Sequence, residues 1–248
     1  MIVFIKLKIK MLAILALTIA AVAAMDEGPV NMKMDGQDTN WEVLQIGYPD
    51  DHIQVNGDSI LLKSWSGLNF AKYASDSFNP DMWEAINPVG KRIEYDVDLN
   101  QVGCSCNACV TLVGMPGHNQ DGSPAPAGGN YYCDANKVGG TYCPEFDIAE
   151  MNKYALVSTA HKCNDPQNNW YDWCDGAGMG THVWDVDNNA FCPEDHCTIN
   201  TSRTFHHGCN FIPGDDGVLN RVACDVSQDD KTVNYDIGND SNYLRAMD

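Results

Sequence analysis

The sequence has few positive charges. It contains 15 lysines and arginines against 34 aspartates and glutamates, which gives a formal net charge of −19. Proteins that bind nucleic acid or anionic membranes use clusters of basic side chains, so this balance argues against both as partners. A neutral polysaccharide is a compatible partner. A large net charge also helps to keep a protein soluble.

Long apolar runs are missing beyond the first 24 residues. The chain starts with three lysines and no acid in its first ten residues, continues with the apolar stretch Met11–Ala24 and ends that stretch in small residues. This is the pattern of a signal peptide. A membrane anchor is the alternative, but about 14 residues is short of the roughly 20 that a transmembrane helix needs. We therefore expect residues 1–24 to be a signal peptide and the protein to be secreted and extracellular.

Cysteine is absent from the first 100 residues, and all eleven cysteines come later. In an exported protein most of them should form disulfides, and the odd number leaves at least one without a partner in the chain. Zinc is the alternative for the closely spaced Cys104, Cys106 and Cys109. Their spacing does not repeat as a paired Cys-x-x-Cys arrangement, so we expect no metal and no cofactor.

Two glycosylation sequons also fit an exported protein. They are Asn200-Thr201-Ser202 and Asn239-Asp240-Ser241. Because the acceptor asparagine must be accessible, both are expected in surface loops.

Helical periodicity is sparse. Glycine, proline, asparagine and aspartate interrupt the chain about every 8–12 residues, a rhythm typical of an antiparallel all-β sandwich. No repeat, low-complexity tract or linker divides the chain, so residues 25–248 are expected to form one domain. The clearest strand candidates, of which the last two form a hairpin, are Ser59–Leu62, Arg92–Leu99, Cys109–Met115, Glu145–Glu150, Val218–Val226 and Lys231–Ile237.

Three carboxylates lie within the six-residue segment EFDIAE: Glu145, Asp147 and Glu150. In a regular strand the first two share one face and the third points to the other. A single β-bulge between Asp147 and Glu150 would bring all three to one face. A solvated acidic face is the simpler alternative, but the interleaved apolar residues indicate that the strand's other face is buried. A calcium site is another, but the alternating Asp/Asn loop with a central glycine is missing.

Two carboxylic acids on one face are the equipment of a retaining glycosidase, in which they lie about 5–5.5 Å apart. One must be ionised to attack the anomeric carbon, and the other must be protonated to donate to the leaving oxygen. Close packing of two acids separates their titrations, because two like charges a few ångströms apart are costly. An intervening aspartate can hydrogen-bond the nucleophile. Catalysis and a structural or metal role both remain open on spacing alone.

The segment Glu145–Cys163, EFDIAEMNKYALVSTAHKC, resembles the active-site segment of glycoside hydrolase family 7, which contains cellobiohydrolases and endoglucanases. The family motif reads Glu-x-Asp-x-x-Glu-x-Asn, followed by a Thr-x-His-x-Cys segment that matches Thr159, His161 and Cys163. Gly90–Cys104 and Tyr132-Cys133-Asp134 resemble two further elements of the family.

The resemblance implies a concanavalin-like β-jelly-roll, a sandwich of two curved antiparallel sheets. By position, Glu145 would be the nucleophile, Asp147 its hydrogen-bonding support and Glu150 the general acid/base. His161, Tyr132 and Asp134 would line the substrate site.

The chain departs from the family in two places. The interval 135–144 is short where the family carries a longer disulfide-rich insertion. The shorter loop favours an open groove and internal cleavage.

The second departure is at the C-terminus. The sequence ends at Asp248, after a segment that resembles the helix before a core strand of the family. The remaining third of the family has no counterpart, so we expect either an incomplete gene product or a reduced jelly-roll that is incomplete at its C-terminus.

The function expected from these features is that of a secreted retaining endo-β-1,4-glucanase that acts on β-glucan, cellulose above all, as a monomer. A β-1,3- or mixed-linkage glucanase is an alternative, because family 16 uses a related motif on the same fold; the offsets of His161 and Cys163 favour family 7. A carbohydrate-binding protein without catalysis is the second alternative.

Aromatic rings pack on sugar faces, so the tryptophans include candidate platforms for sugar stacking. They are Trp41, Trp65, Trp83, Trp170, Trp173 and Trp184.

Overall fold

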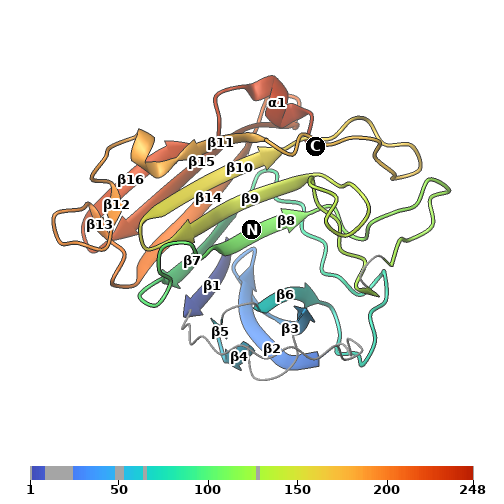
Figure 1. Ribbon diagram of the computed structural model, residues 1–248, viewed down its shortest axis with the longest axis horizontal. Helices are drawn as coiled ribbons and strands as arrows, with labels where there is room; N and C mark the ends of the chain where they lie inside the picture. Colours follow the sequence, from blue (N-terminus) through green and yellow to red (C-terminus); the bar gives the residue numbers. More distant parts are fainter. Residues whose placement is uncertain (1, 9–24, 48–52, 64–65, 127–128, 248) are drawn as a thin grey trace.

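The computed structural model describes residues 2–8, 25–47, 53–63, 66–126 and 129–247. Its regular structure is almost entirely β (Figure 1). The larger sheet has seven strands, whose spatial order is β16 (Lys231–Asp236), β15 (Leu219–Gln228), β14 (Phe205–Pro213), β7 (Arg92–Asp98), β1 (Ile2–Lys8), β5 (Ser59–Leu62) and β4 (Ile53–Asn56).

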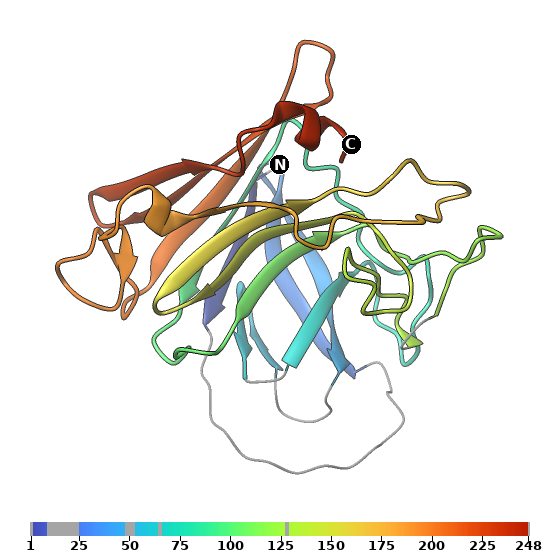
Figure 2. The ribbon, with the colours of Figure 1, turned by 45° about the horizontal axis from the view of Figure 1, so that its top comes forward.

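A four-stranded antiparallel sheet packs across part of the larger one (Figure 2). Its strands in spatial order are β11 (Met179–His182), β10 (Ala155–His161), β9 (Glu145–Asn152) and β8 (Ala108–Val113). The predicted all-β sandwich is confirmed. All six predicted strands are present, each with ends within two residues of the expected ones.

Smaller elements complete the described part of the chain. They are a three-stranded sheet of β2 (Met25–Met34), β3 (Gln37–Gly47) and β6 (Ser66–Ala71), a pair of β12 (Phe191–Cys192) and β13 (Ile199–Asn200), a 3-10 turn (Val183–Asp185) and the helix α1 (Ser241–Arg245). The Asp240 side chain accepts a hydrogen bond from the Asn242 amide at 2.9 Å and so caps α1. Leu244 of this helix is buried. The helix expected near the C-terminus is therefore present.

Strand β1 lies between β7 and β5 and runs parallel to both. It overlaps the predicted signal peptide, residues 1–24, of which residues 1 and 9–24 lie outside the described residues. That peptide and the single domain over residues 25–248 stay predictions. In the described part of the chain, no helix is both long enough and apolar enough to span a bilayer.

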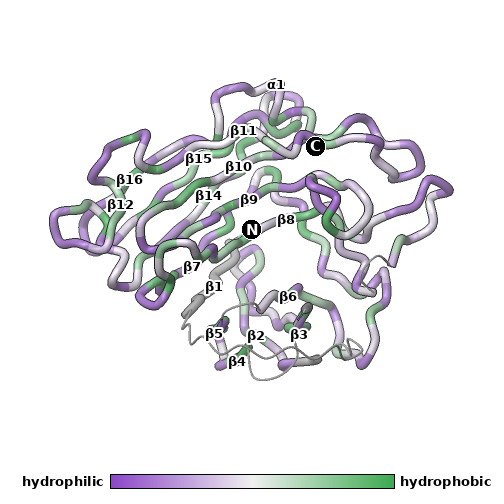
Figure 3. The backbone as a smooth tube through the Cα atoms, viewed as in Figure 1, coloured by the Kyte–Doolittle hydropathy of each residue, from purple (hydrophilic) through white to green (hydrophobic). Residues whose placement is uncertain are grey.

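The core lies between the two larger sheets. Alternate residues of β7, namely Ile93, Tyr95 and Val97, are buried, as expected for a strand with one face on the core. The rings of Phe146 on β9 and Phe211 on β14 meet edge to face, with centroids 5.2 Å apart, and so tie one sheet to the other. Figure 3 shows hydrophobic stretches along the strands and hydrophilic stretches in most connecting loops.

Four disulfides stabilise the second half of the chain, which confirms that most cysteines are paired. The pairs are Cys133–Cys143, Cys163–Cys174, Cys192–Cys197 and Cys209–Cys224. Cys104, Cys106 and Cys109 are outside these disulfides. The first two pairs close loops that flank β9 and β10, so they restrain the backbone next to the carboxylate segment.

One sequon differs from expectation. Asn200 is only 8% exposed, lies on β13, and its side-chain amide donates to Asp195 at 2.8 Å. The prediction that it lies in a surface loop was wrong, because the pairing of β13 with β12 draws it inward. Asn239 is exposed, as predicted.

Candidate active site

The three carboxylates of EFDIAE lie on β9, and this strand carries one extra residue between the second and the third. In the register with β10, Thr159 pairs with Asp147 whereas Val157 pairs with Glu150. Two steps along β10 therefore match three along β9. The register with β8 shows the same shift. The predicted β-bulge is confirmed, and it turns Glu150 to the face that carries Glu145 and Asp147.

Glu145 stands at the start of β9 and is buried, with 7% of its surface exposed. Its Oε2 accepts a hydrogen bond from the Ala135 amide at 3.1 Å. Burial, and next the negative charge of Asp147, raise the pKa of Glu145 from 4.5 to about 7, although the Ala135 amide opposes this shift. The ionised form of Glu145 is thus poorly solvated, which is a property of a reactive carboxylate.

Asp147 is held by two side chains from neighbouring strands. Its Oδ1 accepts from Thr111 Oγ1 at 2.8 Å, and its Oδ2 lies 3.1 Å from His161 Nε2. The other ring nitrogen of His161, Nδ1, lies 2.8 Å from the carbonyl oxygen of Asp175. Both nitrogens face acceptors, so each must carry a proton if Asp147 is ionised. Burial opposes the charge on His161, but the Asp147 carboxylate and the Asp175 carbonyl outweigh it and raise its pKa.

Glu150 has a different environment from Glu145. It is half-buried, and its Oε1 accepts from Asn107 Nδ2 at 2.7 Å. Cys109, which pairs with Glu150 in the register of β8, reaches Asp147 Oδ1 with its thiol at 3.7 Å. A buried carboxyl, a paired aspartate and a more exposed carboxyl therefore follow one another along one face of the strand.

The structure brings Tyr132 and Asp134 to the neighbourhood of Glu145. Burial, followed by the charges of Asp134 and Glu145, raises the pKa of the Tyr132 phenol. Asp134 is buried, and its Oδ1 accepts from the amides of Asn136 and Val138 at 3.0 and 2.9 Å. The Oδ1 atom of Asp134 thus stabilises the loop that contains Ala135. That loop in turn positions the Ala135 amide to donate to Glu145.

The chain has relatives among curated proteins. It is 30% identical over 211 residues to the endo-β-1,4-glucanase celB of Aspergillus oryzae, a match that covers 71% of this chain and 49% of that protein. It is 25% identical over 248 residues to the endoglucanase type C of Fusarium oxysporum, covering 86% of this chain and 56% of that protein. The chain therefore spans about half the length of the curated relatives it matches. No family model matches the sequence.

Solved structures share the fold. An endoglucanase I in complex with cellobiose superposes with a TM-score of 0.59 at 16% identity, over 91% of this chain and 77% of that one. A GH7 family cellobiohydrolase from Daphnia pulex gives a TM-score of 0.58 at 15% identity, over 92% and 77%. The expected resemblance to glycoside hydrolase family 7 is therefore confirmed at the level of the fold. The fold is accordingly the expected β-jelly-roll.

Several neighbours of the carboxylates were not predicted from the sequence: Asn107, Cys109 and Thr111, and the backbone carbonyl of Asp175. Period-two alternation along the predicted strand Cys109–Met115 places Cys109 and Thr111 on one face. The sequence does not show that this strand pairs with β9. The alternation alone therefore could not identify Cys109 and Thr111 as neighbours of the carboxylates.

Among the described residues, the side-chain hydrogen bonds of Asp147 go to Thr111, His161 and Cys109 rather than to Glu145. In this state Asp147 acts on Glu145 through its negative charge, which disfavours the ionised form of Glu145. A hydrogen bond between two carboxyls needs one of them to be protonated, which the raised pKa of Glu145 permits.

The tryptophans divide between core and surface. Trp41 and Trp83 are buried, so they are core residues rather than platforms. Trp173 and Trp184 are about half exposed, at 50% and 49%, and the ring of Trp184 stacks on that of His182 at 4.7 Å. Trp170 is half-buried, and Trp65 lies outside the described residues.

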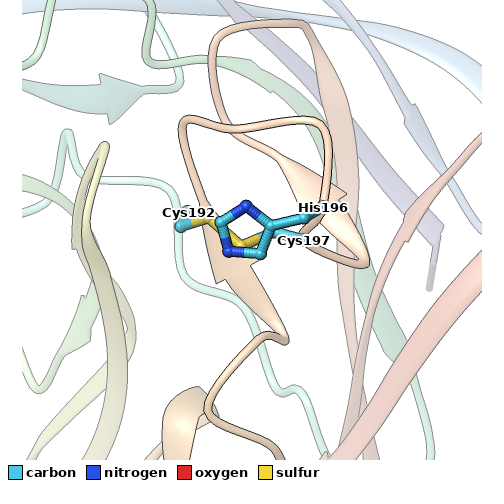
Figure 4. Close-up of side chains that lie close together, drawn as sticks. All are labelled: Cys192, His196 and Cys197. Atoms are coloured by element: carbon cyan, nitrogen blue, oxygen red, sulfur yellow. A yellow bond between two sulfur atoms is a disulfide. The ribbon is translucent and has the colours of Figure 1, made fainter.

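Among the residues that the structure describes, three groups of side chains are close enough to share a metal ion. In two of them, Cys192–His196–Cys197 (Figure 4) and His207–Cys209–Cys224, the two sulfurs are bonded to each other. A disulfide sulfur lacks the thiolate charge that makes cysteine a metal ligand. The third group is Glu145, Asp147 and His161. There both imidazole nitrogens of His161 already face oxygen atoms, Asp147 Oδ2 and the Asp175 carbonyl.

Proposed function

We propose that this chain hydrolyses β-1,4-glucan with retention of anomeric configuration, with Glu145 as nucleophile and Glu150 as general acid/base. The bulge of β9 carries the proposal, because it places both carboxyls on one face in unlike environments. Retaining glycosidases need this combination of proximity and difference.

In the first step the ionised Glu145 attacks the anomeric carbon from the side opposite the leaving group. The bond from that carbon to the glycosidic oxygen breaks, and Glu150 gives its proton to this oxygen. A covalent glycosyl ester on Glu145 results. The half-exposed position of Glu150 suits this role, because the group must meet first a leaving sugar and then water.

In the second step Glu150, now ionised, takes a proton from water. The resulting oxygen nucleophile attacks the anomeric carbon and displaces Glu145. Two displacements on opposite faces restore the original configuration. Both carboxyls return to their starting protonation states, so the cycle closes without a cofactor.

His161 and Asp147 are proposed to set the charge around the nucleophile. The imidazole is hydrogen-bonded to Asp147 and lies opposite Glu145 in the register between β10 and β9. A positive His161 offsets the negative Asp147, so Glu145 can ionise next to an almost neutral pair. We propose that His161, Tyr132 and Asp134 also line the site for the sugar that is cleaved.

Cellulose-type glucan is the proposed substrate because both kinds of comparison find proteins whose names refer to it. The sequence relatives are named endo-β-1,4-glucanase, and one similar structure is an endoglucanase with cellobiose. The purified, oxidised protein is expected to release reducing ends from a soluble cellulose derivative. A Glu194→Gln variant, altered at an exposed glutamate outside β9, should act at the same rate as the unchanged protein. Release of no reducing ends from any β-glucan would overturn the proposal.

The same assay on β-1,3-glucan and on mixed-linkage glucan tests the linkage. Preference for either polymer would replace the β-1,4 assignment while leaving the two-step chemistry in place. Binding of glucan without turnover, unchanged by Glu145→Gln, would instead identify a carbohydrate-binding protein.

The pH dependence should follow Glu145. It must be ionised to attack, and its pKa is raised to about 7 by burial and by Asp147. Glu150 must be protonated in the same step on glucan, so the test uses an activated aryl cellobioside, whose leaving oxygen needs no proton. With that substrate kcat/KM should fall about tenfold per unit as the pH drops below 7, and level off just above 7. Initial rates at low substrate between pH 4 and 9 measure this. A value of kcat/KM for this substrate that does not fall between pH 7 and pH 5 would remove Glu145 from the role of nucleophile.

We propose that the protein acts outside the cell. Four disulfides in the described residues need an oxidising compartment, and the acidic surface suits a soluble protein among neutral polysaccharides. We also expect a monomer, because strands of one chain carry all the carboxyls that the reaction requires.

A further inference from the structure

The bulge that aligns the carboxylates leaves one residue of β9 without a partner. Ile148 has no counterpart in the register with β10 or in the register with β8. It is also fully buried. A buried carbonyl group that is displaced from the ladder must find another donor, or the bulge is destabilised.

Ser158 supplies that donor. Its Oγ lies 2.6 Å from the carbonyl oxygen of Ile148. Ser158 is the residue of β10 between Val157 and Thr159, the two positions where the register shifts, and it is fully buried. Its hydroxyl thus compensates at the point where the bulge interrupts the backbone pairing.

A chain of buried side chains from the opposite sheet orients this serine. Ser158 Oγ lies 2.9 Å from the hydroxyl of Tyr235 on β16, which lies 2.6 Å from His207 Nε2 on β14. His207 Nδ1 in turn lies 2.8 Å from the hydroxyl of Tyr95 on β7. All four side chains are buried away from water, so their polar atoms depend on one another for hydrogen-bond partners.

The direction of every hydrogen bond in this series follows from the group at one end, the Ile148 carbonyl. The Ile148 carbonyl can only accept, so Ser158 donates to it and must accept from Tyr235. Tyr235 has then used its one proton and accepts from the Nε2–H of His207. The other nitrogen of a neutral His207 accepts from Tyr95. Burial lowers the pKa of His207 to about 3, which keeps the ring neutral. Each group uses one proton, and none is left over.

We propose that Ser158, Tyr235 and His207 are positioning residues that hold the bulge of β9 in place and thereby keep Glu150 on the face of Glu145 and Asp147. The catalytic part of this inference rests on the proposed function. Without the serine hydroxyl the bulge loses the donor that occupies its free carbonyl. Without the bulge, Glu150 would turn toward the core, because a shift of one residue reverses the face of every following side chain.

The decisive variant is Tyr235→Phe, with Val233→Ala as its control. Val233 is the neighbouring inward residue of the same strand and is also buried, so its truncation weakens packing without touching the hydrogen-bond chain. Both variants should lower the melting temperature. Only Tyr235→Phe should lower kcat, by about 10–100-fold, while KM changes less than about threefold, because misplacement of about 1 Å costs about that much.

Ser158 gives a second pair of variants. Ser158→Ala removes the donor to Ile148 and should reproduce the loss of kcat. Ser158→Thr keeps a hydroxyl at the same atom and should restore at least half of the lost activity on a logarithmic scale. Equal kcat losses in Ser158→Ala and Ser158→Thr would show that packing, rather than the hydroxyl, matters there.

Amide hydrogen exchange at Ala149 and Glu150 tests the bulge without any substrate. Exchange there should be at least about tenfold faster in Tyr235→Phe than in Val233→Ala at matched global stability. If the unchanged protein proves inactive but this difference is seen, the proposed function fails and the positioning of the bulge stands. Equal exchange and equal kcat in the two variants would overturn the inference.

Discussion

Replacing Glu145 by glutamine should lower kcat on a soluble cellulose derivative by about 10³-fold or more, because no other group can form the covalent intermediate. Glutamine keeps the size of the side chain and an oxygen that can accept from the Ala135 amide. Loss of activity should therefore not reflect loss of the fold. Steady-state rates of the two proteins measure the effect, and Glu194→Gln is the matched control at an exposed position. A loss of less than about tenfold would remove Glu145 from the role of nucleophile.

The same substitution should stabilise the protein at neutral pH. The pKa of Glu145 is raised from 4.5 to about 7 in the folded state, so between these values the folded state binds a proton that the unfolded state has lost. The contribution of Glu145 to the free energy of unfolding consequently falls as the pH rises from about 4.5 to about 7. Above pH 7 the ionised, buried carboxylate destabilises the folded state by its full amount. Glu145→Gln should raise the free energy of unfolding by about 1–3 kcal/mol at pH 8 and by almost nothing at pH 4. Denaturant titrations at the two pH values separate this gain from a general change in packing.

Replacing Glu150 by alanine should lower kcat on the glucan by about 10²–10⁴-fold, the usual contribution of a general acid/base. The loss should depend on the leaving group. An aryl cellobioside with a strongly acidic phenol needs no proton on its leaving oxygen, so Glu150→Ala should still form the glycosyl ester with it. Breakdown of that ester needs a base to activate water, and it should become the slow step.

Azide distinguishes the two carboxyls, because it is a nucleophile that needs no base. With Glu150→Ala it should restore turnover of the activated aryl substrate and give the β-glycosyl azide, since it attacks the intermediate on Glu145. With Glu145→Ala any azide product should have the α configuration, from a single displacement. The reverse pattern of products would exchange the assigned roles.

Local features of the sequence predicted the backbone geometry of the carboxylate segment. The odd spacing between Glu145 and Glu150 predicted a bulge if all three carboxylates share one face, and the registers with both neighbouring strands show that bulge. The final hairpin was also predicted, because Asp229 occupies a turn between two alternating strands, with a φ of 56°. Such features depend on residues close together in the chain.

Features that depend on distant strands could not be predicted in this way. Thr111 holds Asp147 only because β8 pairs with β9 from more than 30 positions away. Ser158 and Tyr235 meet across the two sheets, and nothing in the sequence near either residue indicates the other. The burial of Asn200 likewise follows from pairing with β12 and not from its sequon.

A covalent trap tests the central claim most directly. A 2-deoxy-2-fluoro cellobioside with a dinitrophenyl leaving group should react with the first carboxyl and then persist, because the fluorine slows both displacements while the leaving group speeds only the first. Mass spectrometry of the digested protein should then find one fluorinated cellobiosyl group on Glu145, and none in Glu145→Gln. An adduct on Glu150, or turnover of glucan with inversion of configuration and no adduct at all, would contradict the mechanism.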